Sequence, residues 1–181
     1  MMRATLLAML AVMSPVPGWA QEVANTSYVT SVGEKVLRIE CTVPAGIDES
    51  WKLLTTAEGL KRWAAPVAGI DLRVGGHILT NYDKSKSLGD PGTIHLLILN
   101  YLEKQMITLK VTLNEQFSAK LRREDGNLQE IIQLTDLGGG RTRLTSSMIG
   151  WGTGPAWDKA YAFFAAGNEW TYKQLVASAR P

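Results

Sequence analysis

The first regular pattern of apolar and polar residues is a strict alternation in the segment VLRIECTV, residues 36–43. One side of this segment would carry only apolar side chains, those of Leu37, Ile39, Cys41 and Val43. Successive side chains of a strand point to opposite faces, so the alternation predicts a half-buried β-strand. Pro44 follows directly and ends it, because proline lacks the backbone N–H that pairs with a neighbouring strand.

The next segment, GIDESWKLLTTAEGLKRWAAP, has helical spacing instead. Ile47, Trp51 and Leu54 recur at positions i, i+4 and i+7, which places them on one face of a helix. The tetrapeptide TTAE at 55–58 matches a capping box, which marks the start of a helix. We therefore expect a second short helix to begin there and to end before Pro66.

The chain from there to about Gly150 has the pattern of several strands. In GIDLRVGGHILTNYD the apolar alternation meets Gly75-Gly76, a pair that is typical of a bulge or sharp bend in a strand. The segments GTIHLLILNYLE, MITLKVTL, LQEIIQLTDL and RTRLTSSMIGW follow, separated by short turn signals. Such a series predicts an antiparallel meander. The segment NEQFSAKLRREDGN at 114–127 fits either a loop or a helical turn.

The last pattern predicts one long amphipathic helix from Trp157 to about Ala177, with Gly154-Pro155 at its start. One face of this helix would carry Trp157, Tyr161, Phe164, Asn168, Thr171, Tyr172 and Leu175. An antiparallel sheet with an apolar face needs a cover, and this helix has the matching stripe. The order of elements predicts an α+β fold in which a curved antiparallel sheet wraps around the C-terminal helix.

The N-terminus adds a targeting signal to this picture. Arg3 precedes an apolar run over residues 4–13, and two prolines follow. Gly18 and Ala20 then supply small residues just before an expected cleavage site after Ala20. This is the layout of a secretory signal peptide, and the run is too short to span a bilayer. We expect a signal peptide at 1–20, a flexible leader at 21–34 and a single domain at 35–181. The protein would be exported to the periplasm or secreted, with no stable membrane anchor after cleavage.

The charge and the single cysteine argue against a nucleic-acid surface and against a cysteine nucleophile. The chain has 19 Lys and Arg against 17 Asp and Glu, and the loss of Arg3 leaves a net charge of +1. Near-neutrality with interspersed signs argues against a surface for nucleic acid. The only cysteine, Cys41, stands in the first strand. It cannot form an internal disulfide, and its apolar surroundings favour a buried thiol over a nucleophile.

Taken together, the order of these segments resembles the START-like helix-grip superfamily, SRPBCC, which includes polyketide cyclases and lipid carriers. Within it, the chain is most similar to the AHSA-like branch, named after the activator of heat shock protein 90 ATPase. The resemblance rests on VPAGIDESWKLLTTAEGLKRWAAP, DLRVGGHI, GGGRTRLTSSMIGWG and the aromatic helix, and it covers roughly residues 35–177. It implies a deep cavity between sheet and helix, used for apolar or aromatic molecules. The residues it implies as cavity walls are Trp63, Tyr82, Trp151, Phe164 and Asn168.

The candidate acid–base groups are the two histidines, His77 and His95, because histidine titrates near neutral pH. Both stand in predicted strands beside apolar neighbours, so they are either cavity residues or ordinary surface residues of the sheet. No His, Asp or Glu cluster has the spacing of a metal site, and the glycine-rich segments lack the strand-to-helix context of a phosphate loop. We therefore expect no metal and no cofactor.

Asn168 is the polar residue nearest the centre of the apolar helix stripe, and Gly167 precedes it. A buried amide must find partners, and glycine inside a helix is unfavourable. This pair indicates either room for a ligand or a close approach of the sheet. The aromatic stripe leaves the same choice open, between ordinary core and the wall of a cavity.

These patterns lead to three hypotheses about function. The first is an exported domain that binds a small hydrophobic or aromatic ligand, favoured because no ordered catalytic set is present. The second is an enzyme of cyclase or hydrolase type that uses His77 or His95 in the cavity. The third is a protein-interaction domain. The segment at 96–99, LLIL, is apolar on both faces, so a second copy of the chain is a candidate partner for the outer face of the sheet.

Overall fold

The computed structural model describes residues 23–180, so the expected signal peptide at 1–20 lies outside the described residues. The strands are β1 (Ala24–Asn25), β2 (Tyr28–Val29), β3 (Lys35–Val43), β4 (Val67–Ile70), β5 (His77–Asn81), β6 (Ile94–Leu102), β7 (Met106–Val111), β8 (Gln129–Gly138) and β9 (Arg141–Ile149). The helices are α1 (Ile47–Thr55), α2 (Ala57–Trp63), α3 (Ala119–Glu124), the short 3-10 helix η1 (Asp125–Asn127) and α4 (Pro155–Ser178).

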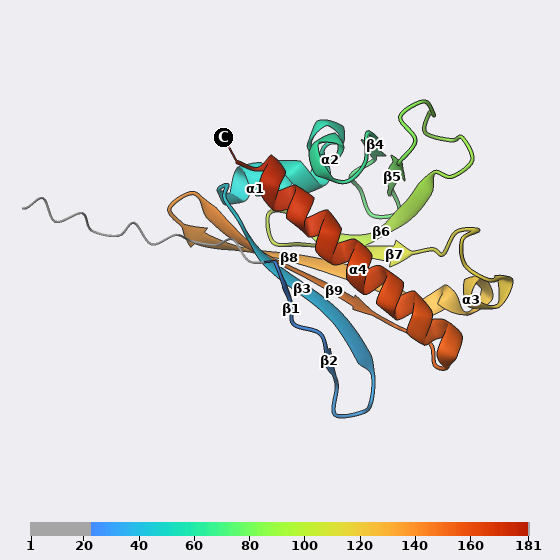
Figure 1. Cartoon of the computed structure of the whole chain (residues 1–181). Coiled ribbons are helices and arrows are strands. Elements are labelled where there is room, and N and C mark those ends of the chain that lie inside the picture. The colour runs from blue at the N-terminus through green and yellow to red at the C-terminus, as the bar shows by residue number, and fades with distance from the viewer. Residues whose placement is uncertain (1–22, 181) are drawn as a thin grey trace, which may run out of the picture.

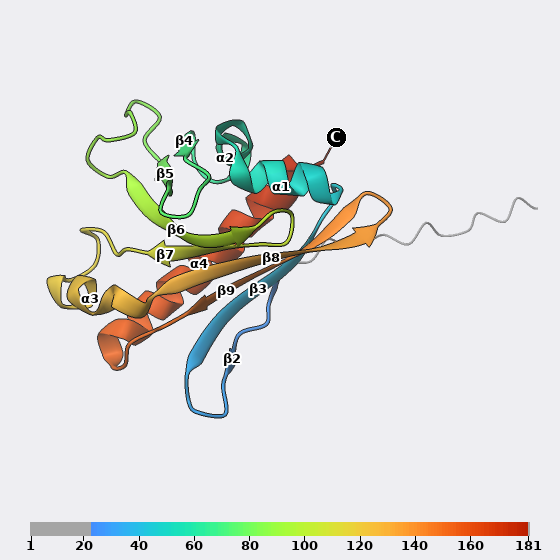
Figure 2. The same cartoon turned by 180° about the vertical axis from the view of Figure 1, so that it is seen from behind.

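The strands form one antiparallel sheet in the order β1-β3-β9-β8-β7-β6-β5-β4, with β2 also paired to β3. Each strand from β4 to β8 pairs with the next strand along the chain, which confirms the expected meander. The first long strand, β3, completes the sheet by pairing with β9. Helix α4 crosses the concave side of the curved sheet, and α1 and α2 lie together near its C-terminal end (Figures 1 and 2). The α+β helix-grip architecture expected from the sequence is confirmed.

Helices α1 and α2 follow each other with one residue between them, and the start of α2 differs slightly from the capping-box reading. The hydroxyl of Thr55 donates to the carbonyl of Trp51 at 2.7 Å, so Thr55 remains part of α1. Thr56 is the N-cap of α2 instead, and its hydroxyl accepts from the backbone N–H of Gly59 at 2.9 Å. This bond satisfies one of the free amides at the helix start.

The segment at 23–34 is more regular than the flexible leader that we expected. Strands β1 and β2 both pair with β3, and the backbone N–H of Thr26 donates to the carbonyl of Arg38 at 2.8 Å. The sequence of this segment is polar and has no clear period, so its pairing depends on the free edge that β3 offers rather than on a pattern of its own.

The glycine pair also has a different role from the expected bend within a strand. Gly75 and Gly76 belong to the turn that joins β4 to β5 as an antiparallel hairpin. Gly75 has a φ of +79°, which is unfavourable for other residues. A Cβ atom at Gly76 would collide with the carbonyl of Asp71. The turn therefore needs glycine at both positions.

The ambiguous segment at 114–127 contains the two short helices α3 and η1. It is held to the sheet by Asp125, whose carboxylate accepts from the backbone N–H of Leu113 at 2.8 Å. Lys110 of β7 donates to the carbonyl of Asp125 at 2.6 Å. These buried contacts fix α3 beside the far end of the sheet.

Helix α4 packs against β3 and α2, and its residues Trp157, Tyr172 and Leu175 are fully buried. Strand β3 supplies the matching surface, because the four apolar residues of its alternating face are all buried as expected. None of the helices between residues 23 and 180 is long and apolar enough to cross a membrane. Burial among these side chains raises the pKa of the Cys41 thiol to about 12, which makes the thiol inert.

The raised pKa of Cys41 predicts a loss of stability at alkaline pH. The folded state keeps the thiol proton while the unfolded chain releases it, so this contribution is complete below the ordinary thiol pKa and is lost as pH rises toward 12. Between about pH 8 and about pH 10, the free energy of unfolding of the wild type should fall by about 1 kcal/mol more than that of Cys41→Ala. Urea unfolding followed by tryptophan fluorescence measures this difference, and identical pH slopes for the two proteins would contradict it.

Candidate functional site

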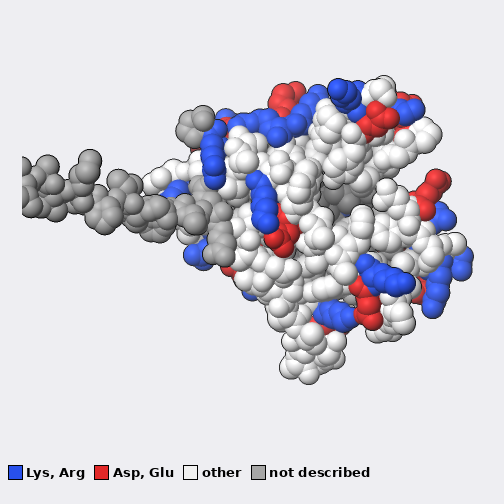
Figure 3. Space-filling view, in the orientation of Figure 1, with Lys and Arg blue, Asp and Glu red and all other residues white. Residues whose placement is uncertain are grey.

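A cavity of about 1000 Å³ lies between the concave face of the sheet and helix α4. Its walls come from β5 to β9, from α2 and from the central part of α4. Most of the strand residues that line it are aliphatic, such as Ile78, Leu96 and Leu109. The surface is hollowed beside α4, with mostly uncharged residues around the hollow (Figure 3). The cavity's volume and its mainly apolar lining fall in the range that is typical of pockets in proteins.

The cavity exists because α4 does not follow the whole curve of the sheet. The helix packs against β3 and α2, whereas the cavity separates it from the inner faces of β5, β6 and β7. Gly167 lies where the helix borders this space, and a Cβ atom there would meet no atom within 4 Å. Gly167 therefore leaves the space open, and the expected alternative of a close approach to the sheet is wrong.

Aromatic pairs border the cavity toward each end of α4. Near α2, the rings of Trp63 and Tyr172 are stacked with centroids 5.9 Å apart, and the indole of Trp63 donates to the carbonyl of Leu53 at 2.9 Å. Near α3, Phe117 stacks on Phe164 with centroids 5.6 Å apart. These contacts hold the rings in place, so the walls do not depend on a ligand to be ordered.

Four of the five residues that the resemblance implied as cavity walls do line the cavity: Trp63, Tyr82, Phe164 and Asn168. Trp151 does not. Its ring packs against Trp157, Tyr161 and Phe164, and its indole N–H donates to the carbonyl of Met148 at 3.0 Å. Trp151 thus supports Phe164 from behind and belongs to the core.

The two histidines lie outside the cavity. His77 and His95 are exposed, and their rings face each other on neighbouring strands with centroids 6.5 Å apart. The register of β5 and β6 explains this position, since the residues next to them, Ile78 and Leu96, are the ones that line the cavity. This geometry contradicts the hypothesis of an enzyme that uses His77 or His95 inside the cavity. Half-buried Leu97 and Leu99 share the outer face of β6, and a homodimer through that face stays a prediction.

The side-chain amide of Asn168 has a hydrogen-bond partner within the protein. Its side-chain nitrogen donates to the sulfur of Met148 at 3.2 Å, and both residues line the cavity. Sulfur is a weak acceptor, so this contact positions the amide without fully satisfying it. Asn168 therefore brings a polar group to the cavity wall from α4.

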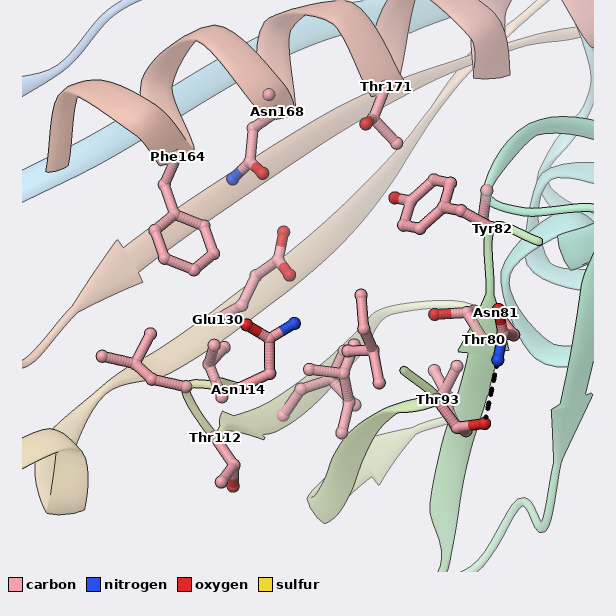
Figure 4. Close-up of a pocket in the computed structure, with 18 of the residues that line it drawn as sticks. Thr80, Asn81, Tyr82, Thr93, Thr112, Asn114, Glu130, Phe164, Asn168 and Thr171 are labelled. Atoms are coloured by element: carbon pink, nitrogen blue, oxygen red, sulfur yellow. Dashed lines mark hydrogen bonds between the residues drawn. The ribbon is translucent and has the colours of Figure 1, made fainter. Parts of the chain in front are cut away.

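Glu130 was not among the residues that the sequence led us to expect in the cavity wall. It lines the cavity from β8, and its carboxylate points into the space below α4 (Figure 4). Its oxygen Oε1 accepts from the hydroxyl of Ser146 at 2.6 Å and from the hydroxyl of Tyr172 at 2.8 Å. The alternation of β8 could have identified Glu130 as an inward-facing residue, because it shares its face with three buried residues, Leu128, Ile132 and Leu134.

The charge of Glu130 affects both tyrosines near it. Burial and this negative charge raise the pKa of Tyr172 well above its ordinary value. Burial of the Tyr82 hydroxyl, with the same charge, also raises the pKa of Tyr82, although a hydrogen bond with Thr171 opposes this. The side chain of Tyr82 is 56% exposed, yet its hydroxyl points inward toward Thr171 of α4 (Figure 4). Both hydroxyls therefore stay protonated near neutral pH.

A metal site is not apparent in the part of the chain that the structure describes. Within residues 23–180, no group of three or more His, Cys, Asp or Glu side chains lies close enough together to hold a metal ion. Apart from four exposed charged residues, the polar groups that line the cavity are hydroxyls, amides and the carboxylate of Glu130. Such a set suits the binding of an organic molecule through hydrogen bonds.

A curved antiparallel sheet gripping a long C-terminal helix, with a cavity between them, defines a START-like protein. Comparison with family models gives the family. Residues 44–179 match the family described as Activator of Hsp90 ATPase homolog 1-like protein, and the chain belongs to this family. The AHSA-like resemblance is confirmed. No curated protein matches the chain in sequence.

Several solved structures share the fold. The crystal structure of CalU16 from Micromonospora echinospora is 19% identical with a TM-score of 0.60, over 89% of this chain and 84% of CalU16. The protein MLL2253 from Mesorhizobium loti is 18% identical with a TM-score of 0.60, over 79% of this chain and 95% of that protein. The Aha1 dimer from Colwellia psychrerythraea is 14% identical with a TM-score of 0.53, over 74% and 92% of the two chains. At these identities the likeness concerns the fold alone.

The open space at Gly167 predicts that this glycine weakens the helix. Gly167→Ala should raise the free energy of unfolding by about 0.5–1 kcal/mol, because alanine has the higher helix propensity and its Cβ meets nothing. Gly59 in α2 is the matched control, since a Cβ there would collide with the backbone of Lys52 and Leu53.

Gly59→Ala should therefore destabilise the protein by roughly 1–3 kcal/mol. Thermal and urea unfolding of the two variants measure both effects. A destabilising Gly167→Ala would contradict the open space described beside α4.

Proposed function

We propose that the protein is an exported binding domain that holds a small hydrophobic or aromatic molecule in the cavity between its sheet and α4. The observation that carries this proposal is the cavity itself, about 1000 Å³ in volume and lined chiefly by apolar side chains. Removal of apolar ligand surface from water contributes about 25 cal/mol per Å². A cavity of this kind therefore favours ligands with a large apolar or flat body.

The position of the aromatic rings also supports binding of a flat or apolar body. Phe164 presents its ring to the cavity and is held by Phe117 and Trp151. Trp63 is fixed by its hydrogen bond to Leu53. Rings that are ordered before binding lose little conformational freedom when a ligand arrives. Such a wall is pre-organised for contact with an apolar molecule.

Binding accounts for the cavity more simply than catalysis does. The cyclase or hydrolase alternative relied on His77 or His95, and both are exposed on the outer face of the sheet. Glu130, the inner charged group, is already held by two hydroxyls through Oε1. These contacts orient the carboxylate as a recognition group, and a recognition role needs no further catalytic partner.

Export is the second part of the proposal. It rests on the order of Arg3, the apolar run at 4–13, the prolines and the small residues before Gln21. An exported domain does not meet cytosolic chaperones, so we do not transfer the ATPase-activating role in the family's description to this chain. In this proposal the family contributes the fold, and the cavity is the functional part.

The binding proposal predicts saturable binding of a neutral aromatic probe, 1-pyrenemethanol, to the purified protein. Gly167→Trp should abolish this binding, because the indole would occupy the border of the cavity where the wild type has open space. Pyrene fluorescence measures the titration. The matched control is Ala166→Trp, because Ala166 is exposed on the same helix and does not line the cavity.

The control variant should bind the probe as the wild type does. Equal binding by both tryptophan variants would place the probe elsewhere on the protein and contradict the proposed cavity. A wild-type protein that does not bind the probe would count against the proposal directly.

The export proposal predicts the mass of the mature protein. When the full chain is expressed in a bacterium with a secretory pathway, the periplasmic fraction should contain a product that begins at Gln21. Intact-mass spectrometry of the two cell fractions measures this. A product that keeps residues 1–20 and stays in the cytosol would contradict export.

A further inference from the structure

Glu130 places a negative charge on a face of the sheet that presents mainly apolar side chains. In the register of the sheet, Leu109 of β7 and Met148 of β9 lie directly beside it on the two neighbouring strands. Both neighbours are 1% exposed. Transfer of a charged group to such surroundings is costly unless the charge is paired.

The protein's own hydrogen bonds use only part of the accepting capacity of this carboxylate. Ser146 and Tyr172 both donate to the same oxygen, Oε1, and both are neutral hydroxyl donors. The other oxygen, Oε2, belongs to the end of the side chain that points into the space below α4 (Figure 4). A hydrogen bond from a charged donor to a carboxylate is about twice as strong as one from a neutral donor. The place for such a donor lies on the cavity side of Glu130.

The other charges that line the cavity are at its rim. They are Asp83, Lys86, Glu115 and Arg122, and all four are exposed. Their two signs are balanced and their charges are screened by water. Glu130 is less exposed than these four, so the interior of the cavity has a net negative charge.

Three further groups from two other elements face the same space as the carboxylate. Asn168 and Thr171 come from α4, and Tyr82 follows the end of β5 (Figure 4). Each of them has an oxygen that can accept a hydrogen bond. A protonated amine has three N–H donors, so it could donate to the carboxylate and also to these oxygens. A carboxylate or phosphate ligand would instead be repelled by Glu130.

We propose that the ligand of this cavity is an amine with an apolar or aromatic body, whose ammonium group pairs with Glu130 while the body lies along the wall formed by Phe164. This inference rests on the proposed binding function and names the class of ligand. It differs from an anionic amphiphile, which would place its head at Lys86 and Arg122 on the rim. The two ligand classes thus use different charged groups of the cavity, one partly buried and the others exposed.

Three probes with one ring system test the inference: 1-pyrenemethylamine, 1-pyrenemethanol and 1-pyrenecarboxylic acid. The purified protein should bind the amine about tenfold more tightly than the alcohol and bind the acid most weakly, since one charge-assisted pair separates them. Glu130→Gln keeps the acceptor oxygen for Ser146 and Tyr172 but removes the charge. This variant should bind the amine about tenfold more weakly than the wild type does, and its affinity for the alcohol should change less than about twofold.

Glu103→Gln is the matched control, because Glu103 is exposed and does not line the cavity, and it should leave all three affinities unchanged. If Glu130→Gln fails to fold, the order of the three probes on the wild type still decides the question. Equal binding of amine and alcohol overturns the inference and leaves the proposed function standing. Tightest binding of the acid overturns it in favour of an anionic ligand. Failure of all three probes to bind contradicts the proposed function, and the inference with it.

Discussion

The structure depends on the mismatch between a straight helix and a curved sheet. Helix α4 buries Trp157, Tyr172 and Leu175 against β3, α2 and the neighbouring strands, and this contact holds the two layers together. The sheet then curves away, so β5, β6 and β7 do not reach the middle of the helix. A fully packed interior would be more stable, since empty space forgoes van der Waals contacts. The protein keeps a cavity of about 1000 Å³ instead, and Gly167 keeps that part of the helix clear.

The same cavity has a second cost, which is the charge of Glu130 among aliphatic side chains. Two hydroxyls, from Ser146 and Tyr172, donate to its Oε1 and reduce this cost. The raised pKa of Tyr172, caused by burial and by this charge, keeps its hydroxyl a donor. Features that weaken a fold and meet in one place are typical of functional sites. In this protein they meet under α4, where the fold provides space, fixed aromatic rings and one oriented carboxylate.

Much of the fold could be predicted from the sequence, because its elements have clear periods. The alternation of β3 and the helical stripe of α4 each identified the correct element, and the capping box located α2 to within a residue. The residues that line the cavity were harder to predict. His77 is followed by Ile78 and Leu79, which put apolar side chains on both faces of the strand, so the period of two could not decide which face is concave. Trp151 follows β9 after Gly150, whose φ is +79°, so the strand pattern does not extend to it. Glu130 was detectable as the charged member of an apolar face.

Native mass spectrometry of the protein purified from its own host would show whether the cavity under α4 holds a small organic molecule. We expect a non-covalent adduct at a ratio of one molecule per chain, present in the wild type and absent from Gly167→Trp. Fragmentation of the adduct should release a molecule that combines an apolar body with an amine. A spectrum that contains only the mass of the bare chain, under conditions that preserve a known complex, would contradict the proposed binding.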